Sequence, residues 1–195
     1  MGAIASKSRV TADELAAMPD EKRYELIDGE LVERAPVGNE SSWIAMCLGS
    51  LLFNHCLANR LGWVFDSESG YQCFPDDPNR VRKPDVSFVR FGRFPNEQIP
   101  KGYAKLAPDL AVEVVSPNDL AEEVESKVGQ FLAAGVRLVW VVYPETRTVR
   151  VQRLDRTISG LLADEELTGE DVVPGFRCRV GDLFPPSAGP AAPPA

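Results

Sequence analysis

The sequence predicts a mixed α/β (α+β) domain: a mixed β-sheet core flanked by helices, with an N-terminal helix and hairpin in front of it. Two apolar runs, "LAVEVVSP" (110–117) and "LVWVVYP" (138–144), are typical of strands covered on both faces, because neither alternates with polar residues. A helical pattern lies between them, over about 119–134. Strand, helix and strand in this order predict a right-handed crossover between two parallel strands.

Helices are predicted from caps and from three- and four-residue spacing. Thr11 followed by Glu14 has the spacing of a capping box, which predicts a short helix over about 12–18. A long amphipathic helix is expected over 41–59, and Gly62 closes it. Its apolar set is Ile44, Cys47, Leu48, Leu51, Leu52 and Cys56. The 119–134 helix is expected to start at an Asn118/Asp119 cap and to stop at Gly135.

The remaining strands follow from turn residues and β-rich runs. Asp28-Gly29 suits a two-residue hairpin turn, because its backbone angles match the twist of the flanking strands. Strands are therefore expected at 24–27, 30–33, 62–74, 83–91 and 148–154, and short strands and turns continue to Phe184.

The chain length allows one core. With 195 residues, we expect a single domain over 11–184 after a flexible N-terminus at 1–10. The last stretch, "PPSAGPAAPPA" (185–195), is a Pro/Ala tail that we expect to be disordered.

Composition and charge restrict the function. The 44% hydrophobic and 26% charged residues, with no run of membrane-spanning length and no signal peptide, predict a cytoplasmic protein without a membrane partner. A formal net charge of −8 disfavours non-specific attraction to nucleic acid, so any contact with it needs a local basic patch. Arg80, Arg82 and Lys83 form the densest one. A solvated loop and a phosphate contact explain that cluster equally well.

Cysteine and histidine patterns exclude several kinds of site. The one histidine, His55, rules out metal centres that need two or three imidazoles, and we interpret it as an ordinary helix residue. The cysteines show no CxxC pair, which fits a reducing compartment and small core residues. They are Cys47, Cys56, Cys73 and Cys178.

Two carboxylates are the main candidates for chemistry. Glu113 interrupts the buried run "LAVEVV", where an unpaired charge costs several kcal/mol. Asp85 begins the strand that follows Pro84, and a neighbouring position in the sheet would bring the two acids together. One acid then protonates or a divalent cation joins them. Hard oxygen ligands without clustered imidazole or thiolate favour Mg²⁺ or Mn²⁺.

Lys127 adds a cation to this site. At 100° per residue it falls on the apolar stripe that Leu120, Val124 and Phe131 form on the 119–134 helix. An inward lysine would reach Glu113, whereas a lysine whose stem covers apolar surface would extend to water.

The sequence resembles a known family in four segments: "YELIDGELVE", "KPDVSFV", "LAVEVVSP" and "SKVGQFLAAGVRLVWVVYPETRTVRV". Their order and separations are similar to those of the Uma2 family of endonucleases, within the PD-(D/E)XK, or restriction-endonuclease-like, superfamily. The resemblance covers about 11–184 and implies a restriction-endonuclease-like sheet.

Carried over by position, the resemblance makes Asp85 the motif aspartate, Glu113 the motif acid and Glu25 an additional family glutamate. The superfamily lysine would stand two residues after Glu113, where this chain has Val115, so Lys127 would replace it. Lys83 is the next candidate. Ser41 stands where family members often have a histidine, and Glu40 would at most partly replace that residue.

The resemblance implies metal-dependent phosphodiester hydrolysis of nucleic acid, DNA before RNA. Asp85, Glu113 and the Val114 carbonyl would hold Mg²⁺ or Mn²⁺, Lys127 would orient or help deprotonate water, and Glu25 would complete the shell or bind a second ion. A homodimer is expected by analogy, because cutting both strands of a duplex suits paired sites.

Two alternatives remain open at this point. A silent binding or assembly module would keep the acids as a remnant paired with Lys127. A carboxylate-pair glycosidase would need a sugar-binding cleft, which the scattered tryptophans Trp43, Trp63 and Trp140 do not suggest.

Overall fold

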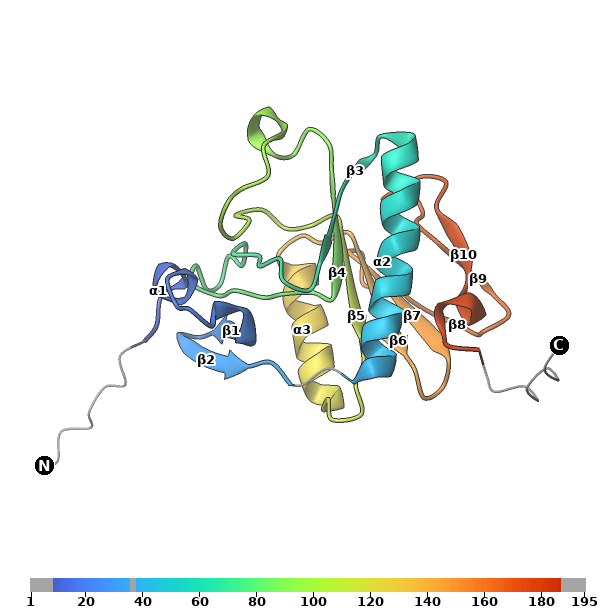
Figure 1. Cartoon of the computed structure of the whole chain (residues 1–195), viewed down its shortest axis with the longest axis horizontal. Helices are drawn as coiled ribbons and strands as arrows, with labels where there is room; N and C mark the ends of the chain where they lie inside the picture. Colours follow the sequence, from blue (N-terminus) through green and yellow to red (C-terminus); the bar gives the residue numbers. More distant parts are fainter. Residues whose placement is uncertain (1–8, 36–37, 187–195) are drawn as a thin grey trace, which may run out of the picture.

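The computed structural model describes residues 9–35 and 38–186 (Figure 1). The expected flexible N-terminus and disordered tail therefore lie almost entirely outside the described residues. The helices are α1 (Ala12–Ala16), α2 (Asn39–Asn59) and α3 (Ala121–Ala133), with 3₁₀ turns η1 (Glu21–Arg23), η2 (Pro95–Glu97) and η3 (Val180–Leu183). The strands are β1 (Tyr24–Ile27), β2 (Glu30–Glu33), β3 (Gly62–Asp66), β4 (Val86–Arg90), β5 (Leu110–Val114), β6 (Leu138–Tyr143), β7 (Thr148–Arg153), β8 (Ile158–Leu161), β9 (Glu166–Thr168) and β10 (Arg177–Arg179).

Six strands form one mixed sheet in the order β3-β4-β5-β6-β7-β8. β5 and β6 are parallel, and every other neighbouring pair is antiparallel. This confirms the predicted α/β class with a mixed sheet. It also confirms that two parallel strands, β5 and β6, are joined along the chain by a helix, α3. The hairpin β1-β2 is separate from the sheet and pairs across the expected Asp-Gly turn, where Asp28 and Gly29 both have positive φ.

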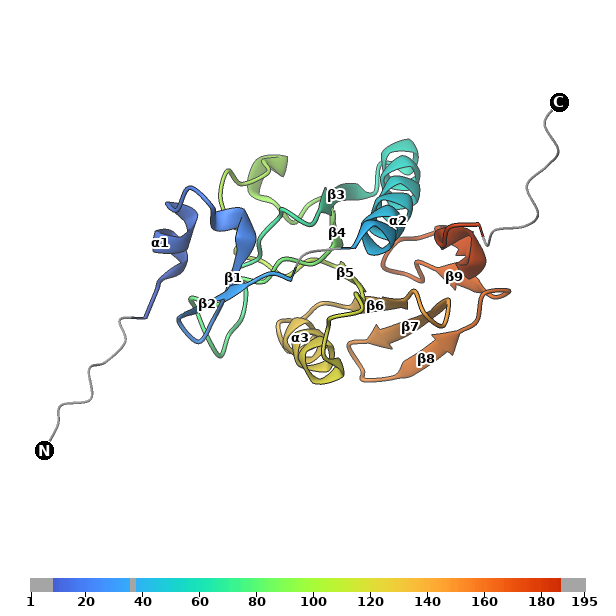
Figure 2. The same ribbon diagram turned by 60° about the horizontal axis from the view of Figure 1, so that its bottom comes forward.

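The two faces of β5 explain its apolar run. Leu110, Val112 and Val114 belong to the core cluster beneath α2, whereas Ala111 belongs to the cluster beneath α3. Figure 2 shows α2 and α3 on opposite sides of the sheet. Because both faces of the strand are covered, neither offers its side chains an open water-facing surface. Glu113 continues the Ala111 face, so its side chain points to the α3 side.

Helix boundaries differ from the sequence prediction in two places. Thr11 caps α1 in a complete capping box, as predicted. However, Asp119 does not cap α3, since its carboxylate accepts a hydrogen bond from the Ser116 N–H at 2.8 Å. Leu120 is the N-cap residue instead and is 63% exposed, so its predicted place on the inward stripe is wrong. Val128 fills that stripe together with Phe131.

The long helix α2 also departs from expectation. It ends with Arg60 in the left-handed conformation, so Gly62 begins β3 and does not close the helix. Among the described residues, α2 is long and apolar enough to cross a membrane by length and composition, contrary to the expectation of no such run. A core helix passes the same test, and Ile44, Leu48 and Leu52 are fully buried against the sheet.

Candidate active site

Asp85 and Glu113 face each other at one end of the sheet. β4 and β5 pair Val86 with Val112, and the next step of this antiparallel register places Asp85 opposite Glu113. The Asp85 carboxylate accepts a hydrogen bond from the Val114 N–H at 2.7 Å, which holds it across the end of β5. Opposed residues of an antiparallel pair point to the same face, so the two carboxyl groups share one site.

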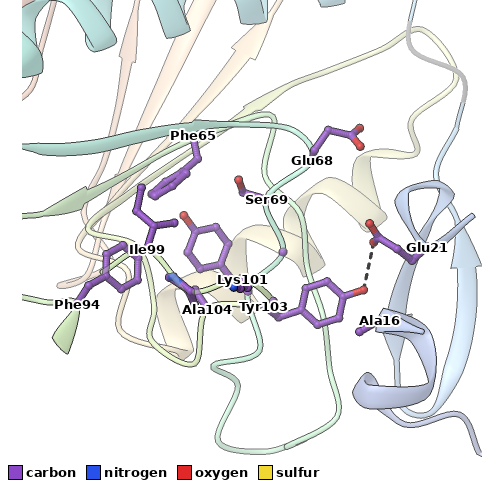
Figure 3. Close-up of a pocket in the computed structure, with 14 residues that line it drawn as sticks. Ala16, Glu21, Phe65, Glu68, Ser69, Phe94, Ile99, Lys101, Tyr103 and Ala104 are labelled. Atoms are coloured by element: carbon purple, nitrogen blue, oxygen red, sulfur yellow. Dashed lines mark hydrogen bonds between the residues drawn. The ribbon is translucent and has the colours of Figure 1, made fainter. Parts of the chain in front are cut away.

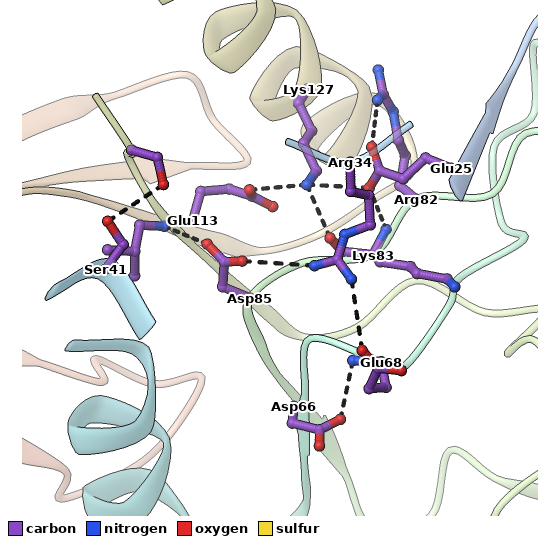
Figure 4. A network of polar contacts seen from close by, with 12 residues as sticks. Glu25, Arg34, Ser41, Asp66, Glu68, Arg82, Lys83, Asp85, Glu113 and Lys127 are labelled. Carbon is purple, nitrogen blue, oxygen red and sulfur yellow. Dashed lines mark hydrogen bonds and ion pairs between the residues drawn. The ribbon is translucent and has the colours of Figure 1, made fainter. Parts of the chain in front are cut away.

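Lys127 reaches this site from α3. Its amine lies 2.9 Å from Glu113 and 3.2 Å from Glu25, and it donates to the Lys83 carbonyl at 2.9 Å (Figure 4). The side chain is 16% exposed. All three of its hydrogen-bonding directions are therefore used, and the surface-lysine alternative does not describe it.

Glu25 arrives from the separate hairpin and is held at both oxygens. One oxygen accepts the Lys83 N–H at 2.6 Å and faces Lys127, and the other accepts from Arg82 at 2.8 Å. Arg82 in turn donates to Gln130 on α3 at 2.7 Å. Glu25 thus connects β1, the segment before β4 and α3. Its occupied oxygens support an anchoring role for Lys127 more than a place in a metal shell.

The pKa values of the acids in the site shift in different directions. Burial raises the pKa of Glu113 to about 8, and Asp85 and Glu25 add to this effect although Lys127 opposes it. Burial also raises the pKa of Asp85. For Glu25, burial acts upward but Lys127 and Arg82 outweigh it and lower its pKa. Burial works against the charge of Lys127, yet the three acids raise its pKa, so it stays cationic.

One buried oxygen of the site lacks a partner. The Oε1 atom of Glu113 is buried without a hydrogen bond among the described residues. A buried carboxylate oxygen without a partner is costly, and a cation or a water molecule would satisfy it. With Asp85 opposite, the donors are hard oxygens, so this pair fits Mg²⁺ or Mn²⁺. Within residues 9–35 and 38–186, however, no three His, Cys, Asp or Glu residues form a ready-made metal cluster.

Arg34 belongs to the site but was not predicted from the sequence. It follows β2, is largely buried, and its guanidinium lies 4.0 Å from Asp85 and 3.9 Å from Glu68 (Figure 4). In the sequence it is one of several charges after a hairpin strand, with no spacing that distinguishes it.

The basic cluster proposed for phosphate contact is buried. Arg80 is 5% exposed and binds Asp76 at 2.6 Å and Asp28 at 3.2 Å. Lys83 is fully buried and binds Glu21 at 2.7 Å, and Arg82 binds Glu25. The solvated-loop reading is therefore wrong. A phosphate contact by these residues stays a prediction. The geometry does not support it, because each of the three cationic side chains already forms an ion pair with an acid of the same chain.

The two departures from the family pattern lie beside β5. Val115 packs against the apolar cluster beneath α3, so it supplies no charge to the site. Ser41, in the first turn of α2, is buried and donates to the Val115 carbonyl at 3.4 Å. Glu40 is exposed. His55 lies far along α2 and contacts the Pro174 carbonyl at 3.0 Å, which agrees with an ordinary structural histidine.

A cavity of about 680 Å³ opens onto the site. Its walls include Asp85, Glu113, Lys127 and Arg34, and its rim carries Asp28, Glu33, Asp119, Glu122 and Glu123. The rim is therefore strongly acidic. A smaller cavity of about 270 Å³ lies near Glu21, Glu68 and Tyr103, and Asp85 and Glu113 do not line it (Figure 3).

Comparison with known proteins identifies the family and the fold of the chain. The Uma2 family model, described as "Putative restriction endonuclease", matches residues 12–181. A crystal structure of a protein from Anabaena variabilis, described as a putative nuclease belonging to DUF820, superposes with a TM-score of 0.73 at 23% identity. The match covers 90% of this chain and 97% of that one, and it shows that the fold is shared. No curated protein matches the chain.

Proposed function

The chain belongs to the Uma2 family of restriction-endonuclease-like proteins, and from this premise we propose that it is a metal-dependent endonuclease that hydrolyses phosphodiester bonds of nucleic acid. The observation that carries the proposal is the pair of opposed acids, in which a buried Glu113 oxygen has no hydrogen-bond partner within residues 9–35 and 38–186. An ordinary structural acid in this position would be fully hydrogen-bonded.

Asp85, Glu113 and the Val114 carbonyl are the residues that would hold Mg²⁺ or Mn²⁺. When bound there, the ion supplies Lewis-acid stabilisation of charge on the phosphoryl oxygens and lowers the pKa of coordinated water. In hydrolysis a water molecule loses a proton as its oxygen bonds to phosphorus, the bond to the leaving oxygen breaks, and that oxygen gains a proton.

The residues of the chain divide the remaining work. Lys127 stays protonated, so it does not act as the base, and its positive charge beside Glu113 would offset negative charge that develops on the phosphoryl oxygens. Glu25 fixes Lys127 by the ion pair at 3.2 Å. The Arg34 guanidinium lies 4.0 Å from Asp85, so it could contact a phosphate bound beside the Asp85–Glu113 pair.

A silent binding module is the second candidate, because Lys127 already acts as an internal cation among the acids. In that case metal would neither stabilise the protein nor promote cleavage. Glu113→Gln separates the two candidates, since it keeps the shape of the side chain and removes the carboxylate that would hold the ion.

We expect Glu113→Gln to abolish Mg²⁺- or Mn²⁺-dependent nicking and the Mn²⁺-induced rise in Tm, while the metal-free protein is as stable or more stable. The measurements are a plasmid-nicking assay, matched assays on single-stranded DNA and RNA, and thermal melts with and without Mn²⁺. Glu123→Gln, an exposed rim acid, is the control that should keep activity. Wild-type protein that neither cleaves nor gains stability from Mn²⁺ would favour the silent module.

A further inference from the structure

The outward face of α2 carries a second apolar stripe. Trp43, Met46, Phe53 and Leu57 are 45%, 71%, 50% and 65% exposed. With Ser50 they follow one another at alternating three- and four-residue spacing, which is the pattern of a helix that packs against another helix. The opposite stripe of α2 already packs on the sheet, so the two apolar faces have separate uses. We call the five residues the α2 outer face.

The exposed polar side chains of α2 are uncharged between its two ends, and Ser42, Asn54 and Asn59 are among them. No charged residue occurs between Glu40 and Arg60. Only 28% of its most apolar 18-residue window is buried within the chain. An exposed apolar stripe of this size is normally covered by another surface, because exposed apolar surface is costly in water. The α2 outer face therefore requires a cover that the described residues do not provide.

The size of the face fits association between proteins. Its exposed apolar side chains amount to on the order of 500 Å², near the upper limit for a monomer, and a standard interface takes about 800 Å² from each partner. The polar flanks of the helix can supply the remainder. Phe53 and Met46 also line a groove of about 590 Å³ between α2 and β3 that extends to Asp85.

We propose that two copies of the chain pair through the α2 outer face, with their helices antiparallel around a two-fold axis at Ser50. Such a pairing is self-complementary, because it places Trp43 of one helix beside Leu57 of the other, and the small Ser50 allows close approach. It also places Glu40 near the partner's Arg60. Among the described residues neither of these exposed side chains has an ion-pair partner, so the charges are complementary across the axis.

Sedimentation equilibrium or light scattering on the full chain without metal tests the pairing. We expect about 43 kDa for the wild type, twice the 21.4 kDa of one chain. Met46→Glu with Leu57→Glu should raise the dissociation constant by at least 100-fold, on the order of two lost apolar anchors. Ile158→Glu with Leu162→Glu, equally exposed at 59% each, is the control that should leave the dimer intact. Circular dichroism melts verify that each variant is folded.

Exchanging the charges tests the antiparallel arrangement. Glu40→Arg or Arg60→Glu alone should weaken the dimer several-fold, and the double variant should restore it. A monomeric wild type at 50 µM, including one that binds anionic vesicles through this face, would overturn the proposal, as would a dimer that Met46→Glu and Leu57→Glu leave intact. Neither measurement uses cleavage, so the dimer proposal is tested independently of the nuclease function.

Discussion

At the scale of single residues, Glu25 and Glu113 show how two acids on one lysine acquire opposite properties. Both contact Lys127, at 3.2 and 2.9 Å. Glu25 also receives Arg82 and a backbone N–H, whereas Glu113 has one cation and an oxygen without a partner. The cations and the backbone N–H around Glu25 lower its pKa, whereas burial raises the pKa of the less well paired Glu113.

The pKa of Glu113 predicts how stability changes with pH. Its pKa rises from 4.5 to about 8 in the folded state, so the folded protein binds one more proton than the unfolded chain between these values. The free energy of unfolding should therefore fall as pH rises through this interval, by at most about 1.4 kcal/mol per unit. Urea unfolding in a chelator at pH 5 to 8 would measure this slope. Glu113→Gln should flatten it, and an equal slope in the variant would contradict the assignment.

Glu25→Gln is expected to behave in the opposite way. It removes the buried anion that Lys127 and Arg82 share, so the free energy of unfolding should fall by about 3 kcal/mol or more at pH 7. Glu33→Gln, which removes an exposed ion pair with Arg23 on the same hairpin, is the control and should cost less than about 1 kcal/mol. Because the Glu25 pKa is lowered, the stabilisation is present above its usual pKa and is lost as pH falls. Equal effects of the two changes in urea unfolding would refute the anchoring role.

At the scale of elements, α3 combines packing with the site. Val128 and Phe131 bury one stripe of the helix against the sheet, and the Phe131 ring lies 6.2 Å from that of Phe74. This contact sets the height and rotation of the helix. Lys127 precedes Val128 by one residue, so the packing of the stripe decides where its amine points.

Phe131→Ala should therefore destabilise the protein far more than a change at the exposed start of the helix. We expect a loss of about 3–5 kcal/mol from the missing ring and its cavity, because Phe131 is fully buried. Leu120→Ala, at the exposed N-cap, should change stability by less than about 0.5 kcal/mol. Thermal or urea unfolding compares the two. A large loss of stability in Leu120→Ala would show that Leu120 packs on the inward stripe after all.

At the scale of the whole molecule, the negative charge of the protein opposes binding of the proposed nucleic-acid substrate. The chain carries a formal charge of −8, and the rim of the site cavity is acidic. The three bases nearest the Pro84-Asp85 motif are held by acids of the same chain. Attraction of a polyanion must therefore come from divalent ions and from a few residues such as Arg34.

Reversing a charge on the rim should strengthen binding. Glu123→Lys should lower the Kd for a nucleic-acid oligonucleotide several-fold at 50 mM salt, and the gain should shrink at 300 mM. Asp164→Lys, exposed in the loop after β8, is the control for net charge and should have a smaller effect. Fluorescence anisotropy gives both values. Equal gains at both places would mean that net charge alone matters and that the cavity is not the binding site.

Patterns along the chain were enough to predict the fold class, the β5-α3-β6 unit, the hairpin turn and the α1 cap. They also predicted that Asp85 and Glu113 would share a site. These features depend on local periodicity, turn chemistry and strand order, which neighbouring residues carry. The register that sets Asp85 opposite Glu113 follows from the same strand order once β4 and β5 are neighbours.

The partners of the charged residues depended on the folded chain. Glu25 comes to Lys127 from a hairpin about a hundred residues earlier, Arg34 reaches Asp85, and Arg80, Arg82 and Lys83 are buried by distant acids. Leu120 is the N-cap residue of α3 and is exposed, because the Asp119 carboxylate accepts a hydrogen bond from the Ser116 N–H and does not cap the helix. Charged residues have no periodic signature, and an ion pair forms wherever packing leaves two opposite charges within a few Å and away from water. Which charges pair therefore depends on distances between residues far apart in the sequence, and no local pattern contains these distances.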